Sequence, residues 1–304
     1  MRPVARPLLA PALLAPALLA PALLALALLA APAAAQQRID RRMPADPHAS
    51  IRIFNLAGST RVTGWDRDSI AVSGSVPRGA GKFFIGGAGS AAKLGVMSDS
   101  LGAPGATLEV SVPRGATVWI KSSSADVTLS GVDGDVDIST VSGAIRAEGA
   151  PRRLTAEAMD GDIDLTTRAA ITRVKTAGGS ITIHGGGGDI TASSVSGTIR
   201  YSGAHKVLVG RLETVTGAVT FQGTVMRGGT LSIETHDGPV DLSVPRDQLA
   251  DFDLTTFGGA VTNALSGGGE PVVPRGKPIR FSSGPGGASV TVRTLKGNVR
   301  VGTS

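Results

Sequence analysis

The sequence has no cysteine and few aromatic residues, which make up 3% of its 304 positions. Without disulfides, the fold must be stabilised by packing and hydrogen bonding. The scarcity of aromatic rings and a formal net charge of only +6 exclude a typical nucleic-acid binder, which combines a strong basic stripe with stacking side chains. No stretch after residue 40 has the 3.6-residue periodicity of an amphipathic helix, so the predicted fold class is all-β.

Residues 1–35 have the features of a secretory signal peptide. Arg2 and Arg6 precede a long run of alanine and leucine, and small residues at Ala33 and Ala35 end it. The alternative is a retained membrane anchor, because the run approaches the length of a bilayer span. We expect cleavage after Ala35, which leaves no membrane span and a flexible N-terminal segment over residues 36–49.

Removal of Arg2 and Arg6 with this segment lowers the formal charge from +6 to +4. The protein is then exported across the inner membrane, to the periplasm, the outer surface or the medium.

A glycine-centred pattern repeats along the rest of the chain. Around Gly143, apolar residues stand seven and five positions before the glycine and two and four positions after it. The pattern recurs around Ala125, Gly161, Gly197, Gly238 and Gly297, and more loosely around Gly58, Gly179, Gly217 and Gly259. Residues two positions apart share one face of a strand, so each unit is predicted to be strand, corner and strand. The glycine is expected to supply a backbone conformation that other residues resist.

The spacing of the units indicates how they are arranged. From Ala125 the centres are 18, 18, 18, 18, 20, 21 and 21 residues apart, and the last step, to Gly297, is 38. The nearly constant step favours a single-stranded β-solenoid of short stacked strands with glycine corners over residues 50–303. The long last step suggests a degenerate unit near residues 277–286. The alternative is an antiparallel β-sandwich, in which each corner is a hairpin turn.

If consecutive units stack in register, the residues at the same distance from each corner glycine lie side by side and form a column. The third residue after the glycine is polar in every unit, and this column places Arg146 beside Asp164 and includes Arg200. Serine or threonine stands three positions before most glycines, where its hydroxyl can satisfy backbone groups at the bend. His236 stands two positions before Gly238, where other units have valine, so it is predicted to lie in the core.

The pattern lapses between the first two units. Residues 79–106 are rich in glycine and small side chains and are predicted to form an irregular excursion, followed by a strand over residues 107–112. Trp119 falls on the outward side of its unit. We expect it either to mark a binding patch or to be covered by the excursion.

Aspartates cluster at Asp133, Asp135 and Asp137 and again at Asp160, Asp162 and Asp164. Neither the EF-hand loop nor the calcium-binding nonapeptide is matched, and aspartate is also typical of tight corners. A retaining glycosidase needs two carboxyl groups about 5–5.5 Å apart in a cleft, which short uniform corners do not provide. We expect no metal and no cofactor. The alternative is a carbohydrate-active β-helix enzyme, a polysaccharide lyase or hydrolase, that uses Asp135 and Asp162.

Three segments carry a family resemblance: GWDRDSIAVSG at residues 64–74, the segment from LEVSVPRG to GAIRAEG at 108–149, and ASVTVRTLKGNVRV at 288–301. They resemble an adhesin-like β-strand-repeat family of bacterial exported proteins, over about residues 50–303. The resemblance implies a β-solenoid-like fold and residence in the periplasm or at the cell surface. It implies no catalytic residues.

Taken together, the sequence predicts a non-enzymatic exported β-solenoid that acts as an adhesion or cell-envelope scaffold module. The expected partner is an envelope protein or a glycan, and not a nucleic acid. The candidate binding residues on its outward faces are Trp119, Arg146, Asp164 and Arg200.

Overall fold

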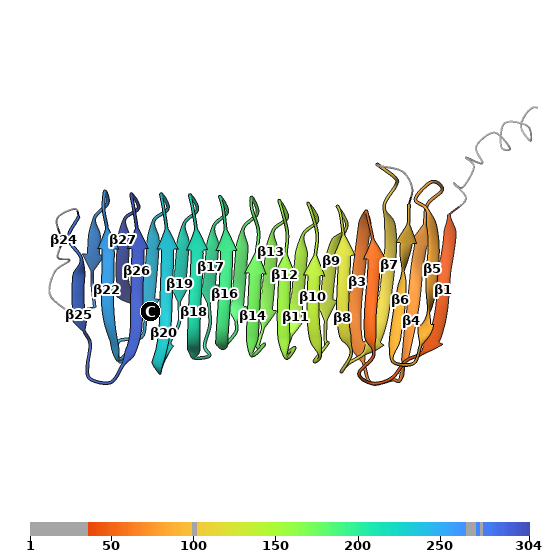
Figure 1. Ribbon diagram of the computed structural model, residues 1–304, viewed down its shortest axis with the longest axis horizontal. Coiled ribbons are helices and arrows are strands. Elements are labelled where there is room, and N and C mark those ends of the chain that lie inside the picture. Colours follow the sequence, from red (N-terminus) through yellow and green to blue (C-terminus); the bar gives the residue numbers. More distant parts are fainter. Residues whose placement is uncertain (1–35, 99–101, 266–271, 274–275) are drawn as a thin grey trace, which may run out of the picture. The chain divides into compact units, whose positions relative to one another are not determined.

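The computed structural model describes residues 36–98, 102–265, 272–273 and 276–304. The predicted signal peptide lies outside these residues. Chain contacts separate a first unit, Met1–Gln36, from the body Gln37–Ser304, and the description below concerns the body alone. Its described residues contain strands and no helix (Figure 1), so no described helix is long and apolar enough to cross a bilayer.

The strands form two sheets, here called sheet A and sheet B. Sheet A has 14 strands in the order β1 (Gln37–Pro44), β4 (Ser69–Val76), β7 (Ala106–Pro113), β3 (Gly58–Trp65), β9 (Asp126–Ser130), β11 (Ile145–Gly149), β13 (Ile163–Thr167), β15 (Ile181–Gly185), β17 (Ile199–Ser202), β19 (Val219–Gln222), β21 (Val240–Val244), β27 (Val299–Thr303), β23 (Val261–Asn263) and β24 (Val272–Val273).

Sheet B has 13 strands in the order β25 (Ile279–Ser282), β22 (Ala250–Thr256), β26 (Ala288–Thr294), β20 (Val225–Thr235), β18 (Val207–Thr214), β16 (Gly188–Ser194), β14 (Ile171–Lys175), β12 (Arg153–Glu157), β10 (Asp135–Ser139), β8 (Thr117–Ser122), β2 (Ser50–Asn55), β6 (Ala91–Met97) and β5 (Lys82–Ala88).

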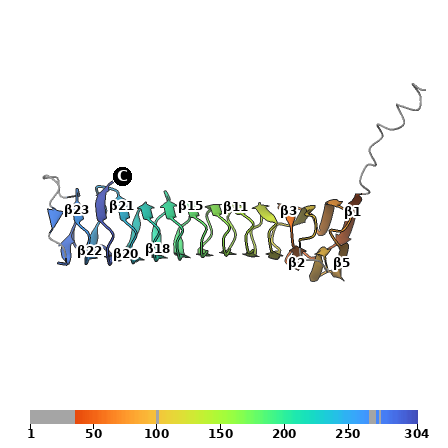
Figure 2. The same ribbon diagram turned by 90° about the horizontal axis from the view of Figure 1, so that it is seen from above.

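From β6 to β23 the chain alternates between the two sheets, one strand in each, and the sheets form two layers (Figure 2). We call a sheet B strand, the corner after it and the following sheet A strand a unit. Strands of consecutive central units pair in parallel, with Ile163 opposite Ile181 and Leu154 opposite Thr172. This parallel register is consistent with a β-solenoid-like fold and differs from the antiparallel pairing of the alternative sandwich.

The core lies between the sheets and consists mainly of rows of valine, isoleucine, leucine and alanine. Each row contains the positions that the repeat pattern predicts, and side chains such as Ile138, Leu165 and Ile233 are at most 1% exposed. Tyr201 and Phe221 add a stacked aromatic pair, with ring centroids 4.9 Å apart. Burial raises the pKa of Tyr201 to about 12.

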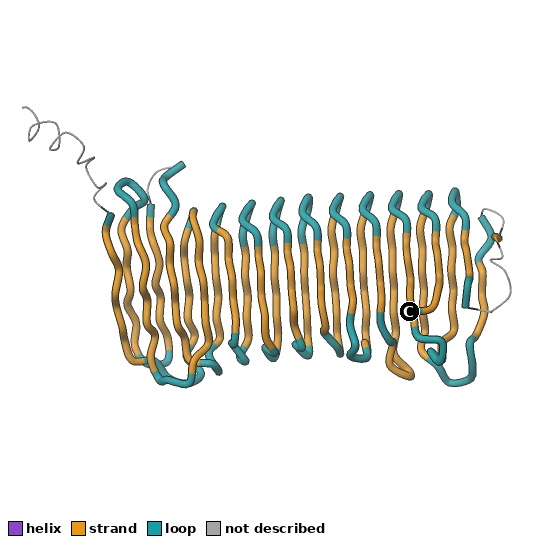
Figure 3. The backbone as a smooth tube through the Cα atoms, turned by 180° about the vertical axis from the view of Figure 1, so that it is seen from behind, coloured by secondary structure: helices purple, strands orange, loops and turns teal. Residues whose placement is uncertain are grey.

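The corners from sheet B to sheet A form an even row along one long edge of the body (Figure 3). The predicted hydroxyl ladder is confirmed there: Thr140 Oγ1 accepts the Gly143 amide at 3.2 Å, and Thr235 Oγ1 accepts the Gly238 amide at 3.0 Å. These hydroxyls satisfy donors that the bend removes from the sheet ladders.

The reason for the corner glycines differs from the one expected. Gly143, Gly161 and Gly238 are not among the glycines with positive φ. A Cβ at Gly161 would instead overlap the backbone carbonyl oxygen of Gly143 in the preceding unit. Glycine is needed because successive corners stack too closely for a side chain.

The core prediction for His236 is wrong. Its side chain is 52% exposed, and the valines at the same position, Val141, Val195 and Val215, are 45–54% exposed. The corner turns this position outward, just after the buried hydroxyl, so that an apolar residue here does not join the core.

The chain does not follow the stack in order at its C-terminal end. β26 lies between β20 and β22, and β27 lies between β21 and β23. The last unit is therefore inserted between two earlier ones, which explains the 38-residue step. The predicted degenerate unit is wrong: within residues 277–286 the strand is β25, which pairs antiparallel with β22.

The outermost strands of both sheets pair antiparallel with their neighbours: β1 with β4, β24 with β23, β5 with β6 and β25 with β22. These strands end the parallel stack, and each has a sheet neighbour on one side only, so the edges of the two sheets lie on antiparallel strands. Two sequence predictions change as a result. Residues 36–49 contain β1 rather than a flexible segment, and the excursion at 79–106 contains the hairpin β5–β6, while the strand expected at 107–112 is confirmed as β7.

Candidate binding patch on sheet B

Trp119 belongs to an outward row that crosses the N-terminal part of sheet B. The register places Lys93 of β6 beside Arg52 of β2, Arg52 beside Trp119 of β8, and Trp119 beside Asp137 of β10. Trp119 is 44% exposed, so the excursion does not cover it. The same excursion instead contributes Lys93 to the row.

Cations lie over the aromatic rings of this region. The Arg52 guanidinium is 4.9 Å from the Trp119 ring centroid. Lys93 Nζ lies 5.0 Å from the Phe54 centroid and 5.8 Å from the Phe84 centroid. We call Arg52, Phe54, Phe84, Lys93 and Trp119 the aromatic–basic patch. A cation–π contact of this kind contributes about 0.5–1 kcal/mol at an exposed site.

Gly95 allows the two phenylalanines to approach. In the register it stands opposite Phe54 on one side and Phe84 on the other, and the two ring centroids are 6.5 Å apart. A Cβ at Gly95 would overlap the backbone carbonyl of Phe54, and its φ of 150° also favours glycine. The two aromatic rings therefore lie on either side of Gly95, which has no side chain to separate them.

Asp137 forms the acidic end of the row. Burial raises the pKa of its carboxyl group, the nearby Glu157 raises it further, and Lys121 opposes them. The patch thus combines three aromatic rings with two cationic donors, and the Asp137 carboxylate lies beside it on the same outer face. Such a set can stack on a sugar ring and bind its acidic substituents by charge-assisted hydrogen bonds.

The structure separates the residues predicted as candidate binders. Trp119 lies on sheet B, whereas Arg146 of β11, Asp164 of β13 and Arg200 of β17 lie on the outer face of sheet A. Arg146 is beside Asp164, as the column predicts. Arg200 is two strands from Asp164, with Thr182 between them.

The alternative catalytic pair is not brought together either. Asp135 begins β10 on sheet B and binds Arg152 at 2.8 Å, a hydrogen bond that lowers the pKa of the carboxyl group. Asp162 follows a corner at the other end of the strands, where its Oδ1 accepts the Ser180 amide at 2.8 Å. Both carboxylates thus bind groups of the stack itself. Among the described residues, no group of three or more histidines or acids could hold a metal ion.

A second open groove, of about 910 Å³, lies along sheet A, where its strands end. Its lining includes Glu148, His184, Ser202, His205 and Gln222, and His184 Nδ1 lies 2.8 Å from Ser202 Oγ. This groove was not predicted from the sequence, because Glu148, His184, Ser202 and Gln222 all fall on the fifth position after a corner glycine and form no motif. The lining surface of the groove is more apolar than polar, and the groove shares no residue with the aromatic–basic patch.

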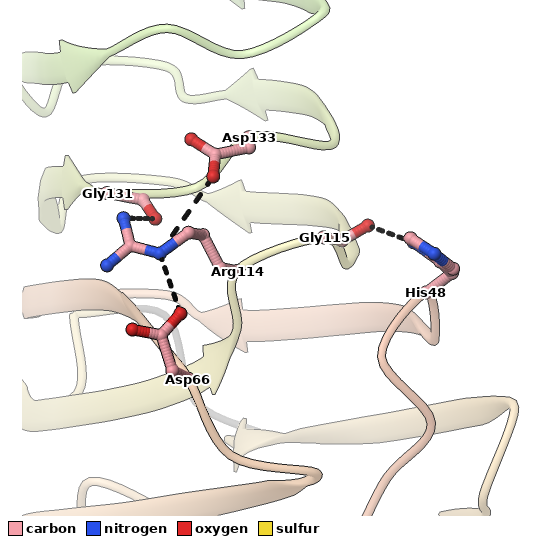
Figure 4. Close-up of polar contacts among 6 residues, drawn as sticks. All are labelled: His48, Asp66, Arg114, Gly115, Gly131 and Asp133. Carbon is pink, nitrogen blue, oxygen red and sulfur yellow. Dashed lines mark hydrogen bonds and ion pairs between the residues drawn. The ribbon is translucent and has the colours of Figure 1, made fainter.

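In the turn that precedes β8, Arg114 holds together turns from three separate parts of the chain (Figure 4). Its Nε lies 3.1 Å from Asp66 and 3.9 Å from Asp133, and its Nη1 donates to the Gly131 carbonyl at 3.2 Å. The hydrogen bond with Asp66 raises the pKa of Arg114 above its ordinary value. His48 Nδ1 donates to the Gly115 carbonyl at 3.2 Å. The Arg114 contacts join the turns after β3, β7 and β9, and the His48 contact joins the turn between β1 and β2 to the turn after β7.

No family model matches the sequence, and no curated protein matches it. Two solved structures are similar to this chain. One is described as a putative cell adhesion protein from Clostridium sporogenes, with 8% identity, a TM-score of 0.24, and coverage of 88% of this chain and 100% of its own. The other is described as a putative adhesin from Bacteroides fragilis, with 10% identity, a TM-score of 0.28, and coverage of 88% and 97%. The overlap is too low for either structure to indicate what this chain binds.

Most of the patch was not predicted from the sequence. Trp119 was singled out, but Arg52, Phe54, Phe84 and Lys93 were not. The apolar segment containing Phe83 and Phe84 is visible in the sequence, yet its neighbours come from β2 and β6, which pair across about 40 residues of intervening chain.

Proposed function

We propose that this chain is an exported, non-enzymatic β-solenoid that serves as an adhesion or cell-envelope binding module, and that the aromatic–basic patch binds an anionic glycan. The observation that supports the proposal is the placement of Arg52 over the exposed ring of Trp119 and of Lys93 over the half-buried rings of Phe54 and Phe84. Export follows from the signal peptide expected over residues 1–35.

The chemistry of the patch favours an acidic sugar polymer over a neutral one. Aromatic faces stack on the C–H faces of pyranose rings, which gives affinity without a deep pocket. Arg52 and Lys93 add cations that bind carboxylate or sulfate groups. The stack presents this patch on a two-sheet support, which holds its side chains in place without a ligand.

Binding to polygalacturonate tests the proposal, with neutral dextran as the control polymer. We expect the protein to retain polygalacturonate, more weakly as salt rises, because exposed charge contacts are screened. Trp119→Ala should weaken binding about tenfold, equivalent to ~1.4 kcal/mol, and Trp119→Phe should weaken it less. Arg200→Ala, on the opposite sheet, is the matched control and should bind like the parent.

Two results would contradict the proposal. Equal retention of both polymers, or Trp119→Ala binding like the parent, would remove the glycan assignment. Release of shorter oligosaccharides from the polymer would contradict the non-enzymatic assignment. If Asp162→Asn then abolished this turnover, the carbohydrate-active alternative would replace it.

A further inference from the structure

A row of side chains runs along the corner edge of the body, with one residue from each unit, and all are exposed except the half-buried Ser123 and Ala177. These residues occupy the position two before the corner glycine or its equivalent, and we call them the ridge. In spatial order they are Met97, Leu56, Ser123, Val141, Met159, Ala177, Val195, Val215, His236, Leu295 and Phe257.

Backbone hydrogen bonds fix the order of the ridge. The Val141 amide donates to the Ser123 carbonyl at 3.0 Å, and the Met159 amide donates to the Val141 carbonyl at 3.0 Å. Equivalent bonds of 2.9–3.2 Å continue from Leu56 to Leu295. Met97 and Phe257 extend the row, since each follows a residue paired with the neighbouring strand.

The ridge is apolar although the fold does not require it. Met159 is 57% exposed, Val195 54% and Phe257 72%, so these side chains contribute little to the core. Ser123 and His236 show that the corner accepts polar residues at the same position. Contiguous exposed apolar side chains on a folded protein mark an interaction surface.

The order of polar and apolar residues along the ridge is symmetric about Ala177. Five residues lie on each side of it, and the polar ones, Ser123 and His236, are each third from an end. If a second ridge faces the first and runs in the opposite direction, apolar residues therefore face apolar residues, and the Ser123 hydroxyl faces the His236 imidazole. This is the self-complementarity that a two-fold interface requires, because each partner uses the same surface.

We propose that the ridge binds the ridge of a second copy of this chain, in antiparallel orientation about a two-fold axis at Ala177. Met159 then faces Val195 of the second copy, and Val141 faces Val215. The small side chain of Ala177 allows close approach at the axis. The residues of both ridges share one repeat of about 4.8 Å, so the two rows stay matched along their whole length.

Charge and area agree with this arrangement. An axis that crosses the ridge leaves each flank facing its own counterpart, so Lys121, two residues before Ser123, faces Glu234, two residues before His236. Lys175 meets its own copy at the axis, where its long side chain can turn aside. A strip about 48 Å long and about 15 Å wide offers on the order of 700 Å² per partner, close to the ~800 Å² of a standard interface.

The oligomeric state of the purified protein tests the proposal. Sedimentation equilibrium should show a dimer, and Met159→Glu and Val195→Glu should each raise its dissociation constant at least 100-fold. Thr182→Glu on the outer face of sheet A is the matched control and should remain dimeric. Far-UV circular dichroism must show that all variants are folded, as expected for exposed positions. A parent that is monomeric at 100 μM, or a dimer that Met159→Glu leaves intact, would overturn the proposal.

Cross-linking tests the orientation, and the absence of native cysteine makes it specific. Ala177→Cys should form a disulfide with its own copy. Val141→Cys should cross-link to Val215→Cys in a mixture of the two variants, and neither should cross-link to itself. Self-linking of Val141→Cys would indicate a parallel arrangement and overturn the antiparallel one. Glycan binding by a monomeric variant would show that the patch on sheet B acts independently.

Discussion

Individual residues at the corners have roles that their sequence neighbours do not reveal. Thr172 and Thr176 lie in the same unit, and both are at most 2% exposed. Thr176 Oγ1 accepts the Gly179 amide at 3.2 Å, whereas Thr172 Oγ1 has no hydrogen-bond partner among the described residues. Comparison of the two threonines thus separates the stability that a hydrogen-bonded buried hydroxyl contributes from the stability that an unbonded one costs.

We expect Thr176→Val to destabilise the protein and Thr172→Val not to. Loss of the Thr176 hydroxyl leaves the Gly179 amide unpaired and should destabilise the protein by about 1–3 kcal/mol. Loss of the Thr172 hydroxyl removes a buried polar group and should leave stability unchanged or raise it. Urea unfolding of both variants measures the difference, and similar destabilisation by both would show that the corner hydrogen bond has no special role.

At the scale of elements, the inserted C-terminal unit is the least expected feature. β26 and β27 fill a space between units that come earlier in the chain, and β26 contacts both β20 and β22. β26 therefore joins β20 and β22, two strands that come earlier in the chain. Because each unit of such a stack contacts only its neighbours, damage to this unit should remain local.

Val292→Asp tests this coupling. Val292 of β26 is 0% exposed, so an aspartate there places a charge in the core and should cost at least ~2 kcal/mol locally. Hydrogen exchange should become faster in β20–β23 and remain slow in β10–β15. Thr291→Asp, on the outward side of the same strand, is the control and should leave exchange unchanged. Uniformly faster exchange along the body would contradict a local effect.

For the molecule as a whole, the regular part was predictable and the ends were not. The repeat offsets identified the core rows, the polar columns and the corner hydroxyls, because side-chain direction alternates along a strand whatever the tertiary context. Pairing at the ends joins strands distant in sequence, such as β2 with β6 and β20 with β26. No local pattern determines such pairing, and the aromatic–basic patch depends on it. The core prediction for His236 is wrong for a related reason: a corner reverses which side of the chain faces inward.

The central units should behave as interchangeable modules, and this gives the last prediction. Register steps there are 18 residues, as between Ile163 and Ile181, and the Gly161 and Gly179 corners make equivalent contacts. A second copy of residues 162–179 inserted after Gly179 should therefore form one more unit, since its strands meet matching neighbours on both sides. We expect a folded protein with a melting temperature within about 5 °C of the parent and a maximum dimension in small-angle scattering about 5 Å longer.

A nine-residue insertion at the same point is the control. It moves the next strand toward the wrong sheet, so this variant should aggregate or lose its cooperative transition. If both insertions unfolded the body, stability would depend on long-range fit rather than on contacts between neighbouring units.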